Sequence, residues 1–334
     1  MLKKIVAGIV AVAVIFLVVG MLLPRKVHVQ RTAEIARPAS MVFATVDSFR
    51  LFPKWSPWQD LDPNMHQATA GPREGVGAKL VWSGNDKVGT GAQVITAAEP
   101  DRSVSSDLDF GRMGIAKSAL LLAPSGGSTR VTWSLDTDMG AGPVGRWFGL
   151  MMDRMIGKDF DAGLRKLKTL VEGMPNVDIA GFDPVPVDMT AGPILVVSET
   201  APLDSPEIGK AYADAYVKIG KFMAKNKLHA AGAPLGIDGD IANGSFSFQA
   251  GMPIDRADVA DADGVRIAQS YQGKALKATH VGPYNTLTGT YDAFRAYVAA
   301  HDYTPAASPI SWYIDDPAKT PPQQLRTEVY WPIR

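Results

Sequence analysis

The chain contains no cysteine, and this absence excludes several chemistries. There can be no disulfide, no thiolate metal site and no cysteine nucleophile, and the composition is compatible with either redox compartment. Histidine is scarce too, and no two histidines stand at the i, i+4 spacing that holds a metal on a helix; the five are His28, His66, His229, His280 and His301. We therefore expect neither a metal ion nor another cofactor.

Net charge is also missing. The 34 basic side chains (Lys and Arg) are balanced by 34 acidic ones (Asp and Glu) in 334 residues. Proteins that bind nucleic acid present a basic surface, and this sequence has neither a basic excess nor a pair of basic helices. It also has no P-loop, dinucleotide fingerprint or G-x-S-x-G motif. We expect no nucleic-acid partner.

One long apolar segment is present, near the start of the sequence. Residues 5–23, IVAGIVAVAVIFLVVGMLL, carry no charge. As a helix they would rise about 28 Å, close to the hydrocarbon thickness of a bilayer. A cleaved signal peptide is the alternative, but the apolar region is long and no A-x-A-like cleavage site follows it. We therefore predict a single-pass transmembrane anchor over residues 1–26, with residues 5–23 in the membrane.

The orientation of this anchor is ambiguous, because basic residues flank it on both sides: Lys3 and Lys4 precede it, and Arg25 and Lys26 follow. Long domains can cross a membrane despite such charges. We expect a short cytoplasmic tail and all remaining residues outside the cytoplasm, on the periplasmic side.

Residues 27–174 are predicted to form a first globular unit. The alternating stretch VHVQRTAEIA indicates a strand, and Pro38 suits the start of a short helix. Several strand-like runs follow, separated by Gly- and Ser-rich breaks such as SGGS that are typical of hairpin turns. A long amphipathic helix, VGRWFGLMMDRMIGKDFDAGLRKLKTLVE, ends the unit. The order implies a curved antiparallel sheet wrapped on that helix.

This order, with RTAEIARPASMVFATVDSFRLFPKWSPW at its front, resembles the START-like helix-grip superfamily (SRPBCC), the group of polyketide cyclase/dehydrase-type and lipid-transfer proteins. The resemblance implies an apolar ligand held between the sheet and the long helix. Trp147, Met151 and Met155 would then line the cavity, since methionine and aromatic side chains suit an adaptable wall. The alternative is that these side chains simply fill the core.

Residues 175–193 are rich in proline and glycine and are predicted to be a linker. Residues 194–334 then contain a repeat, in which each half reads strand, helix, strand, strand. FQAGMPI (248–254) in the first half matches TEVYWPI (327–333) in the second. Two copies predict a pseudo-twofold sheet with both helices on one face and a cleft on the other. The whole chain is therefore expected to be an α+β protein.

The last strand, LRTEVYWPIR, carries an acid. Alternation places Leu325, Thr327, Val329 and Trp331 on the apolar face toward the helices, so Glu328 and Tyr330 should face the cleft. Burial there would raise the pKa of Glu328. The alternative is an exposed acid on the sheet surface, paired with Arg326.

The segments ATHVGPY (278–284) and LRTEVYWPIR resemble the GyrI-like effector-binding family, also found at the C-terminal ends of multidrug-sensing and AraC-type regulators. The resemblance implies that the acid at position 328 lies in an aromatic-lined cleft that meets cationic or polar drug-like ligands. The ligand-binding residues would be Glu328, Tyr330, Tyr284, His280, Trp312 and Tyr313. Because Trp312 and Tyr313 alternate, only one of them can face the cleft. The alternative for His280 is a histidine at the end of a strand that bonds the backbone.

Three functions remain open. The first is a membrane-anchored binding or sensing protein for a small hydrophobic or amphipathic molecule, cationic molecules included. The second is a hydrolase or isomerase of a hydrophobic electrophile, with Glu328 and Tyr330 as the catalytic residues. The third is an envelope scaffold without a ligand. A cation would be attracted to a carboxylate among aromatic rings, which favours the first function.

Overall fold

The computed structural model describes residues 2–111, 114–203 and 206–334. The chain divides into two compact units, residues 1–180 with 295–302 and residues 181–294 with 303–334. Each unit holds one antiparallel sheet, and helices occur in both, so the predicted α+β class is confirmed.

The first unit begins with helix α1, Leu2–Leu22. All its residues are exposed except Gly20. Among the described helices it is the one long and apolar enough to cross a membrane, and a signal sequence would have the same length and composition. The structure places neither of its ends on a given side of a membrane.

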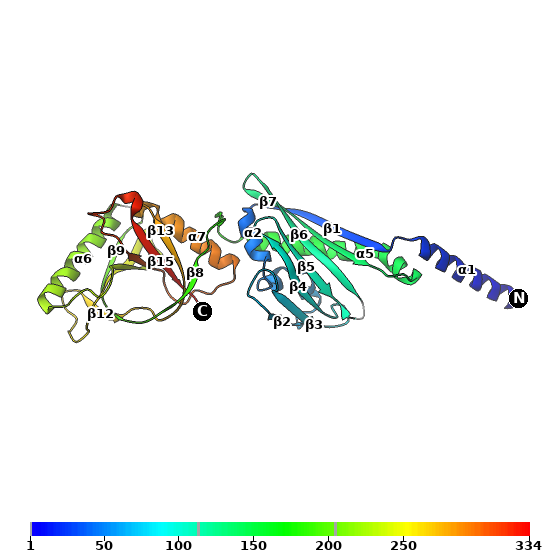
Figure 1. Cartoon of the computed structure of the whole chain (residues 1–334), viewed down its shortest axis with the longest axis horizontal. Coiled ribbons are helices and arrows are strands. Elements are labelled where there is room, and N and C mark those ends of the chain that lie inside the picture. Colours follow the sequence, from blue (N-terminus) through cyan, green and yellow to red (C-terminus); the bar gives the residue numbers. More distant parts are fainter. Residues whose placement is uncertain (1, 112–113, 204–205) are drawn as a thin grey trace. The chain divides into compact units, whose positions relative to one another are not determined.

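A seven-stranded sheet follows, in the order β1-β7-β6-β5-β4-β3-β2 (Figure 1). Its strands are β1 Lys26–Ile35, β2 His66–Ala70, β3 Lys79–Ser83, β4 Thr90–Glu99, β5 Ser103–Asp109, β6 Ile115–Ser125 and β7 Ser128–Asp138. Helices α2 Ala39–Val46, α3 Phe52–Trp55 and α4 Trp58–Leu61 connect β1 to β2, and the long helix α5 Pro143–Glu172 packs against β1. This is the predicted helix-grip arrangement.

Aromatic rings fill the space between this sheet and α5. Trp133 of β7 stacks on Phe160 of α5 with ring centroids 4.1 Å apart, and Trp55 meets Trp133 edge-on at 5.3 Å. Gly163 makes room for this stack, because a Cβ at that position would lie 2.7 Å from the Trp133 ring. The remaining cavity, lined by Phe52, Trp55 and Trp133 among others, measures about 20 Å³, which is space for roughly one water molecule. The interior is thus a filled core.

The second unit contains an eight-stranded sheet in the order β12-β9-β11-β10-β14-β15-β13-β8. Its strands are β8 Val185–Met189, β9 Pro193–Pro202, β10 Leu235–Ala242, β11 Ser245–Pro253, β12 Arg266–Gln269, β13 Gly273–Val281, β14 Ile310–Tyr313 and β15 Arg326–Pro332. Its helices are α6 Pro206–Asn226, the 3₁₀ turns Tyr284–Thr286 and Pro322–Gln324, and the part of α7 (Leu287–Ala300) that runs up to residue 294. The two predicted copies meet at the β10–β14 pair, which lies at the centre of the sheet. The pseudo-twofold arrangement is confirmed.

The edges of this sheet were not anticipated. Strand β8 precedes the first copy but pairs with β13 of the second, and β12 precedes the second copy but pairs with β9 of the first. Residues 185–189 were predicted to belong to a linker and instead form this edge strand. Pro186, opposite Leu276, is tolerated there because β8 is the last strand of the sheet and Pro is compatible with an edge.

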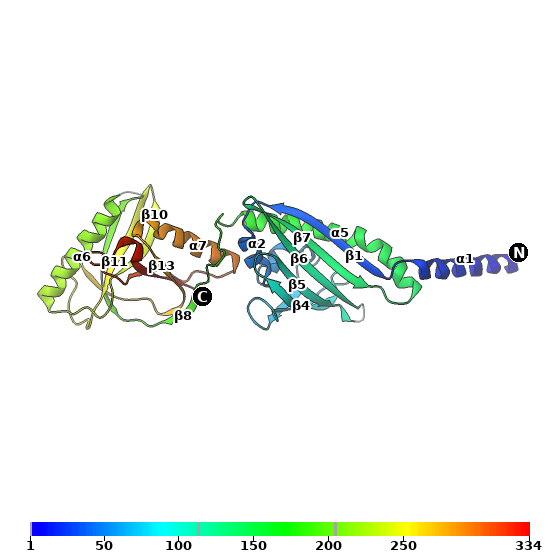
Figure 2. The same ribbon diagram turned by 45° about the horizontal axis from the view of Figure 1, so that its top comes forward.

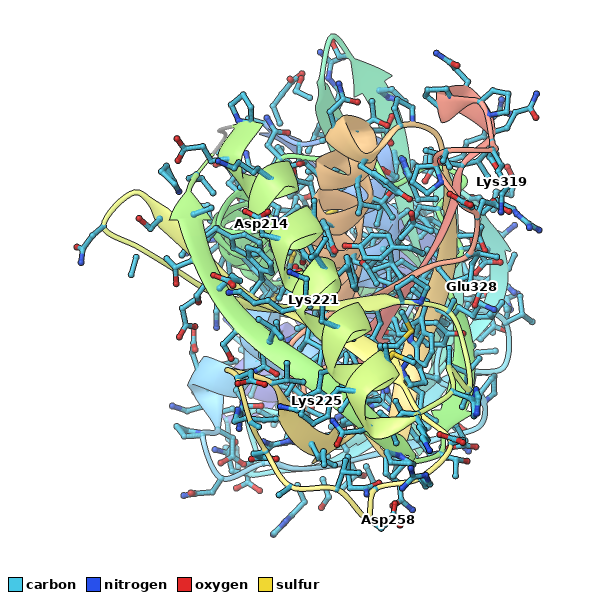
Figure 3. All side chains as sticks on the ribbon, turned by 90° about the vertical axis from the view of Figure 1, so that its left-hand side faces the viewer. Asp214, Lys221, Lys225, Asp258, Lys319 and Glu328 are labelled. Atoms are coloured by element: carbon cyan, nitrogen blue, oxygen red, sulfur yellow. The ribbon has the colours of Figure 1, made fainter. Side chains whose placement is uncertain are left out.

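Strand register shows which residues share a face. Gly236, Ala250, Ser311 and Val329 pair across four neighbouring strands and therefore point to one side of the sheet. Helix α6 packs on this side through Ala215, Ile219 and Phe222, and Phe294 of α7 stacks on Trp331 at 5.5 Å. The opposite surface of α6 is exposed and carries Asp214, Lys221 and Lys225 (Figure 3). Both helices cover one face, as predicted, and we call the other side the cleft face.

Candidate functional site

A cavity of about 410 Å³ opens on the cleft face of the second unit. Ligand sites commonly measure ~300–1,000 Å³, so a small molecule fits this space. The wall combines apolar and charged side chains; it includes Asp188, Met189, Ile194, Lys277, Trp312 and Tyr330. The unexpected edge strand β8 supplies Asp188 and Met189, and it therefore completes the site.

Glu328 is bound by two residues of this wall, Lys277 and Tyr330. Lys277 Nζ is 2.7 Å from Glu328 Oε1, and the Tyr330 hydroxyl donates a 2.8 Å hydrogen bond to Glu328 Oε2. The side chains of Lys277 and Glu328 are 26% and 27% exposed. Lys277 Nζ also lies 5.5 Å from the centre of the Tyr330 ring, within the range of a cation–π contact.

The register of β13 and β15 brings Lys277, Glu328 and Tyr330 together. Lys277 lies directly opposite Tyr330, and Thr279 lies directly opposite Glu328. Lys277 and Glu328 are thus diagonal neighbours on the cleft face, a spacing that long side chains bridge readily. The three side chains of the triad (Lys277, Glu328 and Tyr330) are held by two adjacent strands and need no loop to position them.

The electrostatics of Glu328 differ from the expectation of a raised pKa. Burial raises the pKa of the carboxyl group, but the hydrogen bonds from Lys277 and Tyr330 and the charges of Lys277 and Arg326 together outweigh burial, so the pKa falls below its ordinary value. The same hydrogen bond has the opposite effect on Lys277 and raises the pKa of its ammonium group. Both groups are ionised at neutral pH, and Glu328 is a hydrogen-bonded anion with no proton to give.

The alternative pairing of Glu328 with Arg326 is not found. The Arg326 guanidinium binds Asp315 instead, with Nε–Oδ2 and Nη2–Oδ1 distances of 2.9 and 2.8 Å. These hydrogen bonds lower the pKa of Asp315 to about 2. Glu328 is therefore paired inside the sheet with Lys277, and Arg326 belongs to a separate surface pair.

Trp312 is the aromatic residue of its pair that faces the cleft. It lies opposite both Leu235 and Glu328, on the cleft face. Its indole Nε1 is buried and has no hydrogen-bond partner within the described ranges 2–111, 114–203 and 206–334. The ring of Trp312 borders the cavity, so its contribution to the wall is apolar.

Tyr313, Tyr284 and His280 lie on the helix face, away from Glu328. The Tyr313 ring contacts Tyr284 at 5.3 Å and Tyr212 of α6 at 6.1 Å. His280 lies opposite Thr327, whose side the helices cover. His280 hydrogen-bonds the hydroxyl groups of Thr290 and Thr286 at 2.9 and 3.1 Å. The structure thus joins Glu328, Tyr330 and Trp312 of the expected set and separates the other three.

The expected cavity wall of the first unit is also rearranged. Trp147 stacks on Phe16 of α1 with centroids 5.1 Å apart, while Met151 and Met155 are 57% and 46% exposed. None of the three borders the cavity of about 20 Å³ described above. The reason is that the first turns of α5 turn glycines toward the sheet: Gly149 faces Val27 and Gly157 faces Arg31. The apolar stripe of α5 is buried only from Phe160 onward.

Lys277 was missed from the sequence, although a signal for it exists. In GKALKATHV the residues 277 and 279 alternate with the apolar Leu276 and Ala278. Once this strand is paired with β15, position 277 must share the face of Glu328 and Tyr330. That pairing requires a register, which the sequence pattern by itself does not supply.

The two units match two known families. Residues 26–172 match the family of polyketide cyclase / dehydrase and lipid transport proteins, and residues 186–334 match the GyrI-like small molecule binding domain. The second match begins within β8, which agrees with the place of this strand in the sheet. A comparison with curated proteins found no match.

Solved structures resemble single units of the chain. The C-terminal domain of EcmrR is 16% identical with a TM-score of 0.41, over 46% of this chain and 97% of that domain. A hydrolase from Listeria innocua is 16% identical with a TM-score of 0.34, over 46% and 92%. Truncated norcoclaurine synthase from Thalictrum flavum is 14% identical with a TM-score of 0.36, over 44% and 93%. These values support no transfer of function to this chain.

Proposed function

We propose that this chain is a membrane-anchored binding protein whose ligand occupies the cleft of the second unit. The proposal is supported by the matches to polyketide cyclase/dehydrase-type proteins and to the GyrI-like small molecule binding domain. The observation that carries this proposal is the cavity of about 410 Å³ bordered by Lys277, Trp312 and Tyr330. The cavity between the first sheet and its aromatic stack measures about 20 Å³, so we assign ligand binding to the second unit.

The ligand is an amphipathic molecule. Met189, Ile194 and the ring of Trp312 offer an apolar wall, and the Lys277 ammonium offers a polar contact at one side of it. Lys277 stands between Glu328 and the cavity. A cationic ligand would have to displace the ammonium group before it could reach the carboxylate, whereas an acidic or uncharged acceptor could use Lys277 directly. We therefore favour an acceptor group over the cation that the sequence suggested.

Catalysis by Glu328 is less well supported. A general acid at neutral pH needs a raised pKa, and a general base needs a free lone pair directed at the substrate. Glu328 has a lowered pKa, and each of its carboxylate oxygens is bound by a neighbour. The pairing suits a positioning role in which Glu328 holds Lys277 and Tyr330 at the wall.

The anchoring part of the proposal is supported by α1. Its 21 residues are exposed apart from Gly20, and its length and composition suit a bilayer. We place the two globular units outside the cytoplasm, as the sequence analysis does. Residues 2–22 would then be the link that keeps the binding cleft at the membrane.

Thermal-shift measurements on the full chain in nanodiscs test the ligand assignment. The probes are decanoate as an acid, tetraphenylphosphonium as a lipophilic cation and a neutral polycyclic compound. The variants are Lys277→Met and, as a matched control, Lys274→Met, because Lys274 lies on the same strand but is exposed on the other face. We expect decanoate to stabilise the wild type and Lys274→Met, and to lose its effect in Lys277→Met.

The cation should behave in the opposite way. Removing the ammonium leaves Glu328 without its charged partner, so Lys277→Met should gain a response to tetraphenylphosphonium. If the wild type responds to the cation and Lys277→Met does not respond more strongly, the proposed acceptor-type ligand is wrong. If no probe distinguishes Lys277→Met from Lys274→Met, the cleft is not the binding site.

A further inference from the structure

The first turns of α5 carry an exposed apolar stripe, which we call the α5 stripe. Its four residues are spaced at i, i+4, i+7 and i+11, so they share one side of the helix. They are between 46% and 66% exposed, and they are Val144, Phe148, Met151 and Met155. Soluble surfaces rarely expose a contiguous row of large apolar side chains unless something covers it.

The α5 stripe lies beside α1, and α1 does not cover it. Contact between the two helices is made by neighbouring positions on α5: Trp147 stacks on Phe16, and its Nε1 donates a 3.0 Å hydrogen bond to the Phe16 carbonyl. The Arg146 guanidinium donates to the carbonyl groups of Met21 and Leu23 at the end of α1. Gly20 permits this approach, since a Cβ there would lie 2.7 Å from Pro143. Figures 1 and 2 both show the start of α5 next to the end of α1.

The contact with Phe16 defines a depth. Phe16 precedes the last residue of α1, Leu22, by a stretch of helix that rises about 9 Å. If α1 spans the bilayer, Trp147 therefore contacts α1 roughly 9 Å inside the end of the span. Interfacial helices bury their apolar side to a similar depth of ~5–10 Å.

The distribution of charged residues along α5 agrees with this depth. Between Pro143 and Met152 the helix has one charged residue, Arg146, and the end of α1 accepts its hydrogen bonds. Charged residues become frequent from Asp153 onward, and Asp153 is itself paired with Arg31 of β1 at 2.9 Å. The part of α5 that would touch lipid is thus the part with the fewest charges.

We propose that the first turns of α5, residues 143–155, lie in the interface of the bilayer that α1 spans, with the α5 stripe buried among lipid acyl chains. This inference rests on the membrane anchoring proposed above. It makes the attachment two-point: α1 crosses the membrane, and the first turns of α5 enter its surface beside α1 and fix the orientation of the helix-grip unit. The apolar residues that sequence analysis assigned to a ligand cavity would then contact lipid.

Site-directed spin labelling tests the proposal, and the absence of native cysteine makes each label unique. The full chain is prepared as Phe148→Cys and Met151→Cys, reconstituted in vesicles of phosphatidylcholine and phosphatidylglycerol, and compared for access to oxygen and to a water-soluble nickel chelate. Val12→Cys in α1 is the control within the span, and Lys158→Cys, exposed on the same α5, is the control in water. We expect labels at 148 and 151 to favour oxygen over nickel at least tenfold more than the label at 158 does.

The outcomes separate the inference from the function on which it rests. Labels at 148 and 151 that are open to nickel while the label at 12 is protected would overturn lipid contact and retain the anchor. A label at 12 that is open to nickel would overturn the anchor itself. Spin–spin broadening with protection from both reagents would mean that a second copy covers the α5 stripe, which also overturns the proposal.

A second measurement needs no cysteine. Brominated lipids quench the fluorescence of tryptophan that lies within the acyl region. The fraction of fluorescence quenched should therefore be smaller in Trp147→Phe than in the wild type. The same quenching in both proteins would contradict the proposed depth of Trp147.

Discussion

The two sheets of this protein differ in what lies against their inner surfaces. In the first unit Trp133, Trp55 and Phe160 stack between sheet and helix and leave about 20 Å³. In the second unit the helices cover one face, and the other face retains a cavity of about 410 Å³. The ligand site must therefore be argued from the cavity and not from the fold.

The largest expected effect comes from removing the aromatic stack. Trp133→Ala should lower the free energy of unfolding of the first unit by about 3–5 kcal/mol, because a buried ring that contacts Trp55 and Phe160 is replaced by a cavity. Trp312→Ala in the cleft should cost less, since its ring already borders open space. Urea unfolding followed by circular dichroism measures both. Equal losses of free energy of unfolding in the two variants would mean that Trp312 is packed as closely as Trp133.

Two glycine substitutions also compare the packing of the two units, with smaller expected changes in the free energy of unfolding. Gly163→Ala places a methyl group 2.7 Å from Trp133 and should destabilise the first unit by about 1–3 kcal/mol. Gly220→Ala on exposed α6 meets no atom within 4 Å and should stabilise the second unit by about 0.5–1 kcal/mol. Thermal unfolding of each variant gives the signs. A stabilising Gly163→Ala would contradict the close packing of the first core.

The ion pair in the cleft predicts a dependence on pH. Because the folded-state pKa of Glu328 lies below its ordinary value of 4.5, its ionised form stabilises the folded protein above that pH. This contribution is lost as the pH falls through the lowered folded-state pKa. Glu328→Gln should therefore be less stable than the wild type at pH 7 by about 1 kcal/mol or less, and the difference should shrink at pH 3. Urea unfolding at both values checks the sign, and a difference that grows at pH 3 would contradict it.

The smallest effect is expected on the helix face of the second sheet. His280→Ala removes hydrogen bonds to Thr286 and Thr290 but leaves the cleft untouched. Binding of decanoate should then change by less than about twofold, which is below 0.5 kcal/mol. Isothermal titration calorimetry with decanoate measures the dissociation constant of His280→Ala, which is compared with that of Lys277→Met. A tenfold loss in His280→Ala would mean that the ligand lies among the helix-face residues instead.

Much of the fold could be predicted from the sequence, because the relevant patterns are local. Alternation in the last strand placed Glu328 and Tyr330 opposite the buried Val329 and Trp331, and the internal repeat predicted the pseudo-twofold sheet. The site was predicted less well. Lys277 depends on the register between β13 and β15, and β8 depends on an open sheet edge, which only the folded chain provides.

The periodicity of α5 shows another limit of sequence patterns. A continuous apolar stripe predicts that one side of a helix is covered, but it does not say where the sheet ends. Phe160 lies under the sheet, and Phe148 does not. The pattern correctly predicts an apolar side of α5, and only the folded chain shows that its large apolar residues are buried from Phe160 onward.

Hydrogen–deuterium exchange of the full chain in nanodiscs, with and without saturating decanoate, tests whether the ligand occupies the cleft of the second unit. We predict slower exchange in β8 and β13 (residues 185–189 and 273–281), which border the cleft, and no change in the strands of the first sheet. Protection confined to β4–β7 and α5 would place the ligand in the first unit and contradict the assignment of binding to the cleft beside Lys277.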